Sequence, residues 1–237
     1  MKHQSDFPPR NASRERRTGA FGEGRETALV LASSSPRRRE LLEQLGLPYE
    51  VIEPAPDDDP ADHRPAVQFA LDLAERKGRS VADGHGLERR WVLGADTVVF
   101  DDDEILLKPA DREEARPMLR RLSGRTHRVV TALAVFPPLT ADAAARPGGA
   151  PSLGGASSTR TAEVARDVTA VTFAPLTDAE IDWYLDTEEW RGVAGGYRIQ
   201  GRGAALVERV EGTYSTVVGL PIRLLYSMLR HTGYRFP

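Results

Sequence analysis

Short apolar segments typical of β-strands outnumber the helical segments in this chain of 237 residues, and their order restricts the fold. Strands are predicted at residues 28–32, 91–100, 105–107, 128–136 and 163–173, a further hairpin at 204–218, and helices at 36–45, 65–82, 111–124 and 221–233. Because several strands follow one another without a helix between them, the regular strand–helix alternation of a Rossmann fold does not fit. The pattern predicts an α/β chain of the mixed α+β type, with a mixed twisted sheet flanked by helices.

Two segments lack the apolar period of strands and helices. Residues 1–27 are rich in Arg, Pro, Gly and Ser, so we expect a disordered N-terminal extension. Residues 137–160 have a similar bias and lie between two strand patterns, which predicts a flexible hairpin loop. The remaining chain, residues 28–237, is long enough to enclose one hydrophobic core and is expected to form a single domain.

The composition limits the functions that are open to the chain. A formal net charge of −3 gives no general attraction to nucleic acid or to a membrane, so an anion site must be a local cluster of cations. The absence of cysteine excludes disulfides, thiolate catalysis and cysteine-bound metals. No apolar run approaches the ~20 residues of a membrane span, and the polar N-terminus does not resemble a signal peptide. We therefore expect a cytoplasmic protein.

Three consecutive arginines open the helix in LASSSPRRRELLEQLG, residues 31–46. Ser35 suits the N-cap and Pro36 the first helical position, which places Arg37, Arg38 and Arg39 in the first turn. Each exposed cation there costs roughly 0.3–1 kcal/mol, because the N-terminal end of a helix is itself positive. Free N–H groups, serine hydroxyls and guanidinium groups together predict a site for an oligophosphate. The alternative is a basic surface turn without a ligand.

The helical period separates the three arginines. Leucines define the buried face of this helix, and Arg38 lies closest to that face, with Arg37 on its flank and Arg39 furthest away. We therefore expect Arg37 and Arg38 to contact a ligand and Arg39 to be solvated.

Polar residues interrupt the apolar strand WVLGADTVVF at Asp96 and Thr97. A buried carboxylate is costly unless it is paired, hydrogen-bonded or bound to a metal. Lys108, in LLKP, follows the returning strand, and a hairpin of this length can bring its ammonium to the same cleft as Asp96. The alternatives are a turn or bulge aspartate with backbone partners and a solvated lysine at a strand end.

A glycine-rich stretch, GGYRIQGRG, carries Gln200. Glycine permits a ligand to approach the backbone, and the Gln200 amide offers a donor and an acceptor to a base edge. The alternative is a mobile loop with a chance glutamine. The spacing matches neither GxGxxG nor the Walker A pattern. The five histidines show no metal-binding spacing, and His127 is typical of a strand start.

Six ordered blocks between residues 29 and about 229 resemble the Maf family of nucleoside triphosphate pyrophosphatases: LASSSPRRRELLEQLG, LAERKG, LGADTVV, LLKP, LRRLSGRTHRVVTALAV and IQGRGAALVERVEGTYSTVVGLPI. The resemblance implies a two-lobed fold with a deep cleft, similar to inosine triphosphate pyrophosphatase. It also implies hydrolysis of a nucleoside triphosphate to the monophosphate and pyrophosphate, with a divalent metal cation, Mg²⁺ or Mn²⁺, and a possible homodimer.

The same resemblance implies roles for individual residues. Substrate phosphates would be bound by four residues of the opening motif and two cleft lysines: Ser33, Ser35, Arg37, Arg38, Lys77 and Lys108. Asp96 matches the catalytic proton acceptor and, together with Asp58, the acidic metal site. Base choice would depend on Arg37, Thr97 and Gln200.

Gln200 favours the subgroup that acts on dTTP and UTP over the one that acts on 7-methyl-GTP. The sequence departs from the usual family pattern at Ser34 and Arg198, where glycine is commoner. We expect Arg198 either to add a phosphate contact or to narrow the base pocket.

Two other classes of function compete with this prediction. The first is a non-enzymatic cell-division (septum) regulator that binds nucleotide or a protein partner. The second is a nucleic-acid binder, which the negative net charge and the lack of an aromatic platform disfavour.

Overall fold

A computed structural model of the chain describes residues 15–17, 29–56, 64–102, 104–139 and 160–236. The strands in this part of the chain are β1 (Glu15–Arg17), β2 (Leu29–Ala32), β3 (Tyr49–Val51), β4 (Trp91–Asp101), β5 (Glu104–Leu106), β6 (Thr126–Phe136), β7 (Glu163–Phe173) and β8 (Val207–Glu211). The α-helices are α1 (Pro36–Gln44), α2 (Ala66–Ala82), α3 (Arg112–Leu122), α4 (Asp178–Asp186), α5 (Tyr214–Val218) and α6 (Ile222–His231). Two short 3₁₀ turns, η2 (Ala194–Gly196) and η3 (Arg202–Leu206), lie between α4 and β8.

The strands form one mixed sheet in the order β1-β3-β2-β4-β6-β7-β8, and β5 pairs with β4. β2 is parallel to β3 and β4, whereas β4, β6, β7 and β8 are successively antiparallel. The predicted mixed sheet flanked by helices is therefore confirmed. No helix in the described ranges is long and apolar enough to cross a membrane.

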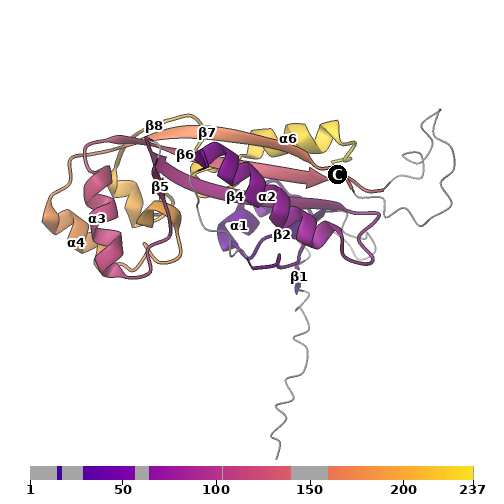
Figure 1. Cartoon of the computed structure of the whole chain (residues 1–237), viewed down its shortest axis with the longest axis horizontal. Helices are drawn as coiled ribbons and strands as arrows, with labels where there is room; N and C mark the ends of the chain where they lie inside the picture. Colours follow the sequence, from indigo (N-terminus) through magenta and orange to yellow (C-terminus); the bar gives the residue numbers. More distant parts are fainter. Residues whose placement is uncertain (1–14, 18–28, 57–63, 103, 140–159, 237) are drawn as a thin grey trace, which may run out of the picture.

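In the central strands β2, β4 and β6, both faces of the sheet are largely buried, and side chains alternate between the faces. In β2, Val30 and Ala32 pack toward α2, while Leu29 and Leu31 face a second core that contains side chains of α1, α4 and α6. Figure 1 shows the two lobes that result: α1, α2 and β2 lie along one half of the long strands, and α3 and α4 at the other end. This arrangement agrees with the predicted two-lobed fold.

One edge of β4 is interrupted. β2 pairs with residues 91–94 of this strand, and β5 pairs with residues 99–101. The opposite edge pairs with β6 continuously from Val92 to Phe100, so β2 and β5 share the same edge. Between them, in the described sheet, residues 95–98 have no strand partner on that edge. We call this stretch the β4 gap, and Asp96 lies within it.

Helix α2 contacts β4 backbone to backbone. A Cβ atom added at Gly94 would lie 2.2 Å from the main-chain oxygen of Ala74, and one at Gly78 would lie 2.5 Å from a ring carbon of Phe136. Only glycine allows this separation. Because Lys77 directly precedes Gly78, the close packing holds its side chain beside the β4 gap.

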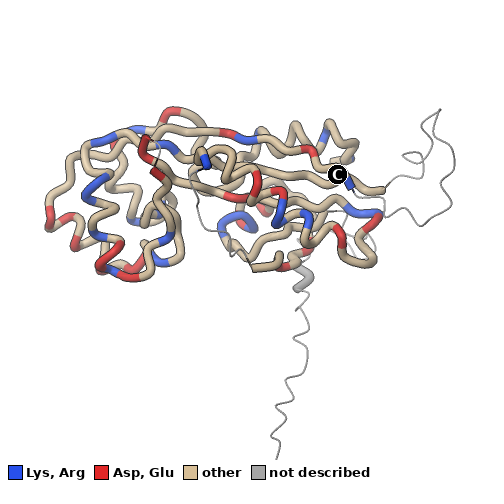
Figure 2. Tube along the Cα trace, in the orientation of Figure 1, with Lys and Arg blue, Asp and Glu red and all other residues tan. Residues whose placement is uncertain are grey.

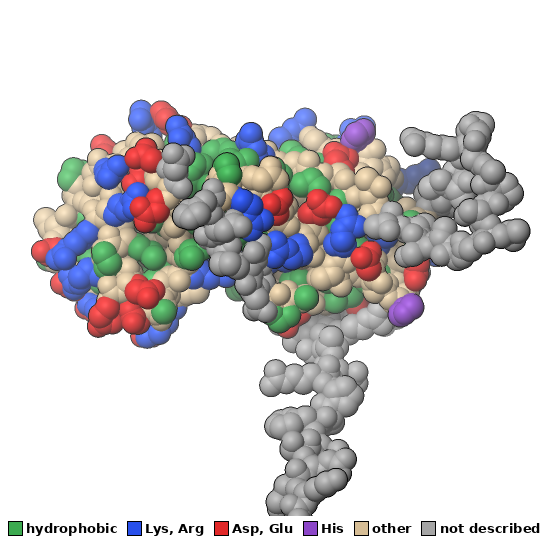
Figure 3. Space-filling view, viewed as in Figure 1, with side chains coloured by type: hydrophobic (Ala, Val, Ile, Leu, Met, Phe, Trp, Pro, Cys, Tyr) green, Lys and Arg blue, Asp and Glu red, His purple; other side chains and the backbone are tan. Residues whose placement is uncertain are grey.

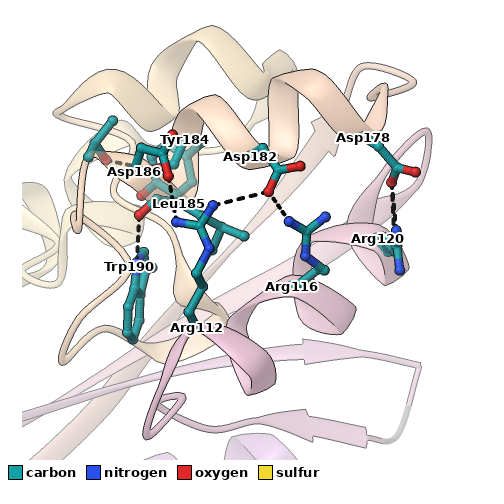
Figure 4. A network of polar contacts seen from close by, with 10 residues as sticks. Arg112, Arg116, Arg120, Asp178, Asp182, Tyr184, Leu185, Asp186 and Trp190 are labelled. Atoms are coloured by element: carbon teal, nitrogen blue, oxygen red, sulfur yellow. Dashed lines mark hydrogen bonds and ion pairs between the residues drawn. The ribbon is translucent and has the colours of Figure 1, made fainter.

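Basic positions along α3 lie next to acidic positions along α4 (Figure 2). α3 is capped by Asp111, whose carboxylate accepts from the Glu114 amide at 2.9 Å, and α4 begins with a capping box of Thr177 and Glu180. Figure 4 shows an arginine–aspartate ladder between the two helices, made by Arg112, Arg116 and Arg120 with Asp178, Asp182 and Asp186. Exposed pairs of this kind contribute little singly, but the ladder fixes how the helices are aligned.

Arg160 anchors the strands on either side of the β6–β7 connection. Its buried guanidinium donates hydrogen bonds to the main-chain oxygens of residues 82, 87, 90, 136 and 137. The C-terminal end of α2, the turn before β4 and the end of β6 are thereby tied to the start of β7. The predicted flexible loop at residues 137–160 falls largely on residues 140–159, which lie outside the described part.

The structure differs from the sequence prediction at three places. Glu15–Arg17, inside the segment expected to be disordered, form β1 and pair with β3, whose free edge offers backbone partners. β3 itself was not predicted. The predicted hairpin at 204–218 is wrong: β8 pairs with β7, and residues 214–218 form α5, because a partner distant in sequence satisfies β8.

Candidate active site

The N-terminal end of α1 opens onto a cavity. Ser35 occupies the N-cap position with φ −64° and ψ 117°, and Pro36 begins the helix, as predicted. The Ser35 side chain makes no capping hydrogen bond, however, and the first turn contains no acidic residue. The positive end of the helix is thus left uncompensated, which is the arrangement that binds anions.

Arg38 is buried and joins three separate elements. Its Nε donates to the main-chain oxygen of Gly219 at 2.8 Å, Nη1 to Ser33 Oγ at 2.9 Å and Nη2 to Thr97 Oγ1 at 3.1 Å. Burial lowers the pKa of Arg38, an effect that the nearby Asp96 carboxylate opposes. Arg38 therefore fixes α1 against β4 and the turn after α5.

Arg37 lines the cavity beside Arg38. Its pKa is lowered to about 10, first by burial and then by repulsion from Arg198 and Arg38. Arg39 is half-buried and does not line the cavity. Arg38 is the most buried of the three arginines, as the helical period predicts, while Arg39 is less solvated than expected. The ligand contacts of Arg37 and Arg38 stay a prediction.

Asp96 lies in the β4 gap, where it is 8% exposed. One of its carboxylate oxygens accepts from Lys77 Nζ at 2.5 Å. Lys108, just after β5, lines the same cavity, and its pKa is lowered first by burial and then by repulsion from Lys77. Two lysines and one carboxylate from α2, β4 and the segment after β5 are thus brought together.

The cavity has a volume of about 400 Å³ and lies between the two lobes. Four predicted phosphate-binding residues of the opening motif line it: Ser33, Ser35, Arg37 and Arg38. The other predicted site residues that line it are Lys77, Asp96, Thr97, Lys108 and Gln200. Asp58 lies outside the described residues. The sequence pattern thus identified side chains that converge on one cavity.

The segment from residue 191 to 200 forms the opposite wall and contains residues that sequence reasoning did not identify as part of a site. Tyr197 and Arg191 both line the cavity. The Tyr197 hydroxyl hydrogen-bonds to His127 Nε2 at 2.8 Å, which attaches this wall to the start of β6. In the sequence, the available signal was the aromatic residue Tyr197 between a glycine pair and the apolar Ile199.

Net positive charge is concentrated in the cavity. On the face shown in Figure 3, acidic and basic side chains are interspersed. Within the cavity, Asp96 is the one carboxylate among the described lining residues, and it faces several cations. The site therefore suits a ligand of high negative charge.

The donor groups in the described ranges form no cluster of three or more His, Asp or Glu side chains suited to a metal ion. Mg²⁺ is commonly held by one or two carboxylates, with substrate phosphates and water completing its ligands. Asp96, open to a cavity that also suits phosphates, fits a cation held mainly through the substrate.

Comparison with known proteins identifies the family. The dTTP/UTP pyrophosphatase of Symbiobacterium thermophilum is 43% identical over 206 residues, which cover 87% of this chain and 94% of that protein. The dTTP/UTP pyrophosphatase of Thermus thermophilus is 42% identical over 209 residues, covering 87% and 96%. A solved HAM1 protein from Coxiella burnetii aligns with a TM-score of 0.43 and 14% identity over 86% of this chain and 98% of that one. The model of the family described as Maf-like protein matches residues 28–232. This chain belongs to the Maf-like protein family.

Proposed function

We propose that the protein hydrolyses a nucleoside triphosphate, dTTP or UTP, to the nucleoside monophosphate and pyrophosphate. One observation carries the proposal: an uncompensated helix N-terminus and the cations Arg37, Lys77 and Lys108 line the same cavity as the Asp96 carboxylate. Relatives more than 40% identical over most of the chain are named dTTP/UTP pyrophosphatases, in agreement with this chemistry.

The cations would bind the triphosphate. Arg37 and Lys108 have lowered pKa values because each is partly buried near other positive groups, and phosphate oxygens between them would relieve this repulsion. The Ser33 and Ser35 hydroxyls and the free N–H groups of α1 add hydrogen-bond donors. Arg38, already bonded to Ser33 and Thr97, would hold this surface in shape while presenting its charge.

Asp96 would accept the proton of the water that attacks the α-phosphorus. Its ion pair with Lys77 fixes one carboxylate oxygen, which leaves the other to orient that water. A divalent cation, Mg²⁺ or Mn²⁺, held by Asp96 and the phosphates, with Asp58 as the second expected carboxylate, would neutralise charge on the phosphate oxygens. Lys77 and Lys108 would stabilise the departing pyrophosphate.

The base would be read on the side of Gln200. This exposed residue lies on the wall opposite α1, and its amide offers a donor and an acceptor to a pyrimidine edge. Thr97 accepts from Arg38 and shares a hydrogen bond of 2.9 Å with Thr131, so its influence on base choice would pass through the position of Arg38.

The test is pyrophosphate release from dTTP, UTP, CTP, ITP and 7-methyl-GTP with Mg²⁺, Mn²⁺ or EDTA. We expect release from dTTP and UTP that requires the metal. Asp96→Asn should lower kcat by at least about a hundredfold, since general bases contribute about 10²–10⁴. Asp83→Asn, at an exposed position after α2, is the matched control and should keep kcat.

A folded Asp96→Asn protein with near-normal kcat would contradict the assignment of the base. If the wild-type protein released no pyrophosphate from any of the five nucleotides, the site would be a binding feature. The regulator of cell division would then be the better proposal. The cytoplasmic location and the homodimer stay predictions.

A further inference from the structure

Arg198 lies in the cavity wall and is only partly satisfied by protein groups. Its main-chain N–H donates to the Tyr184 hydroxyl at 3.0 Å, and its Nη2 donates to the main-chain oxygen of Arg191 at 3.1 Å. The Nε atom is buried and has no hydrogen-bond partner among the described residues. A buried donor without an acceptor is unfavourable, so the charge of this guanidinium is not fully compensated by protein groups.

Arg198 faces Arg37 across the cavity. Both residues line it, Arg37 from the first turn of α1 and Arg198 from the opposite wall. They are close enough for the charge of Arg198 to contribute to the lowered pKa of Arg37. Two guanidinium groups that repel each other across a cleft are complementary to an anion placed between them.

The main chain of Arg198 is tied to helix α4. Tyr184, which holds the Arg198 main chain, belongs to α4, and the Trp190 indole donates to the main-chain oxygen of Leu185 on the same helix at 3.0 Å. Figure 4 shows both residues next to the arginine–aspartate ladder that joins α4 to α3. Arg198 itself lies in the irregular segment between η2 and η3, and the Tyr184 hydrogen bond attaches the main chain of that segment to α4.

We propose that Arg198 is a phosphate-binding residue that clamps the triphosphate of the substrate, and the pyrophosphate product, against Arg37 from the opposite lobe. This inference rests on the proposed function, because it assigns a further contact for the same substrate. The ligand between the two arginines is the oligophosphate and not the base, because thymine and uracil are neutral and cannot compensate two facing cations.

The experiment measures the binding of inorganic pyrophosphate by titration calorimetry to the wild-type protein and to Arg198→Ala and Arg198→Gln. The Gln variant retains a long polar side chain and so provides a second neutral protein if Ala folds poorly. Arg202→Ala is the matched control: it removes the same charge from the same stretch at an exposed position that does not line the cavity. Thermal unfolding verifies that each variant is folded.

We expect both Arg198 variants to bind pyrophosphate at least about tenfold more weakly, because a charge-assisted hydrogen bond is lost. Arg202→Ala should bind within about twofold of the wild type, as is usual for an exposed surface change. The KM for dTTP and UTP should rise together in the Arg198 variants, so that the preference among bases does not change.

Unchanged or tighter binding of pyrophosphate by a folded Arg198 variant would overturn the inference, since repulsion of Arg37 would then be its main effect. An altered preference among bases with unaltered pyrophosphate binding would also overturn it. The binding measurement requires no turnover. Failure of the proposed hydrolysis, seen as no pyrophosphate release by the wild type, is therefore distinguishable from failure of this inference.

Discussion

At the scale of single residues, a buried histidine supports the cavity wall. His127 is 1% exposed, shares a hydrogen bond with Tyr197 and contacts the Phe173 ring edge-on at 5.2 Å between centroids. Burial lowers the pKa of His127 to about 4. The neutral ring is therefore the form that packs behind Tyr197 over the physiological range of pH.

This histidine should make the free energy of unfolding depend on pH. The unfolded chain protonates His127 near pH 6.5, whereas the folded protein binds that proton only near pH 4. The unfolded state thus binds more protons between these values, so stability falls as the pH is lowered from about 7 to about 4 and levels off below. The difference between the two pKa values corresponds to a loss of about 3 kcal/mol of unfolding free energy.

Urea unfolding at several values between pH 7 and pH 4 measures this dependence. His127→Gln, which lacks a titrating group but can still bond to Tyr197, should lose less stability over this range than the wild type. The carboxylates titrate equally in both proteins and cancel in the difference. Parallel curves for the two proteins would contradict the assignment to His127.

The chemistry of the site was predictable at this scale where residue type alone is informative, and unpredictable where partners are distant. Consecutive arginines after a serine-rich turn and a carboxylate inside an apolar strand are visible in the sequence. The hydrogen bond from Arg38 to the Gly219 carbonyl, 181 residues away, is not visible there. Nor does the sequence show that Arg198 faces Arg37, because that proximity arises from the packing of the two lobes.

At the scale of elements, the contact of α2 with β4 determines the distance between Lys77 and Asp96. The main chains touch at Gly78 and Gly94, where an added methyl group would lie far inside van der Waals distance of its neighbours. Any side chain at Gly94 must push α2 outward, and Lys77 would move with the helix.

Gly94→Ala should therefore reduce both stability and turnover. Overpacking of this kind costs about 1–3 kcal/mol, and the displaced Lys77 would hold Asp96 less well. Urea unfolding and kcat/KM for dTTP measure the two effects. Arg89→Ala, at an exposed position before β4, is the control and should alter neither by much. A stable Gly94→Ala protein with normal kcat/KM would show that this contact does not position the site.

Helices and strands were predictable where local pattern and final partners agree. The long apolar patterns of β4, β6 and β7 located these strands closely. β3 has three residues, which is too short for a periodic pattern. In the segment after η3, β-branched residues favoured a strand, but Tyr214–Val218 form a helix that Gly219 ends with φ 117°. Tertiary packing there overrides local propensity.

At the scale of the whole molecule, the cavity exists because the sheet is interrupted. β2 and β5 occupy two parts of one edge of β4, and the β4 gap between them is where the two lobes face each other. No local pattern specifies this arrangement, since it depends on strands that pair out of chain order. The mixed sheet was predictable from the order of elements, whereas the place of the opening was not.

We propose that residues 28–237 form the complete catalytic domain. All described residues that line the cavity lie between 33 and 218. β1 lies at the edge of the sheet, where β3 and β2 separate it from β4. A protein that begins at Ala28 after an initiator Met should keep kcat/KM within about twofold and lose about 1 kcal/mol or less of unfolding free energy, as is usual for changes away from a core. Loss of turnover in this folded protein would assign the N-terminal segment a part in the site.

The hydrogen bonds of Arg160 have a practical consequence. They bind the start of β7 to carbonyls of α2, the turn before β4 and the end of β6, so both ends of the connection between these strands are anchored independently of what joins them. We therefore expect the register of β6 and β7 to tolerate changes in the length and composition of that connection. A reporter or an affinity tag inserted there should leave the pairing of these two strands unchanged.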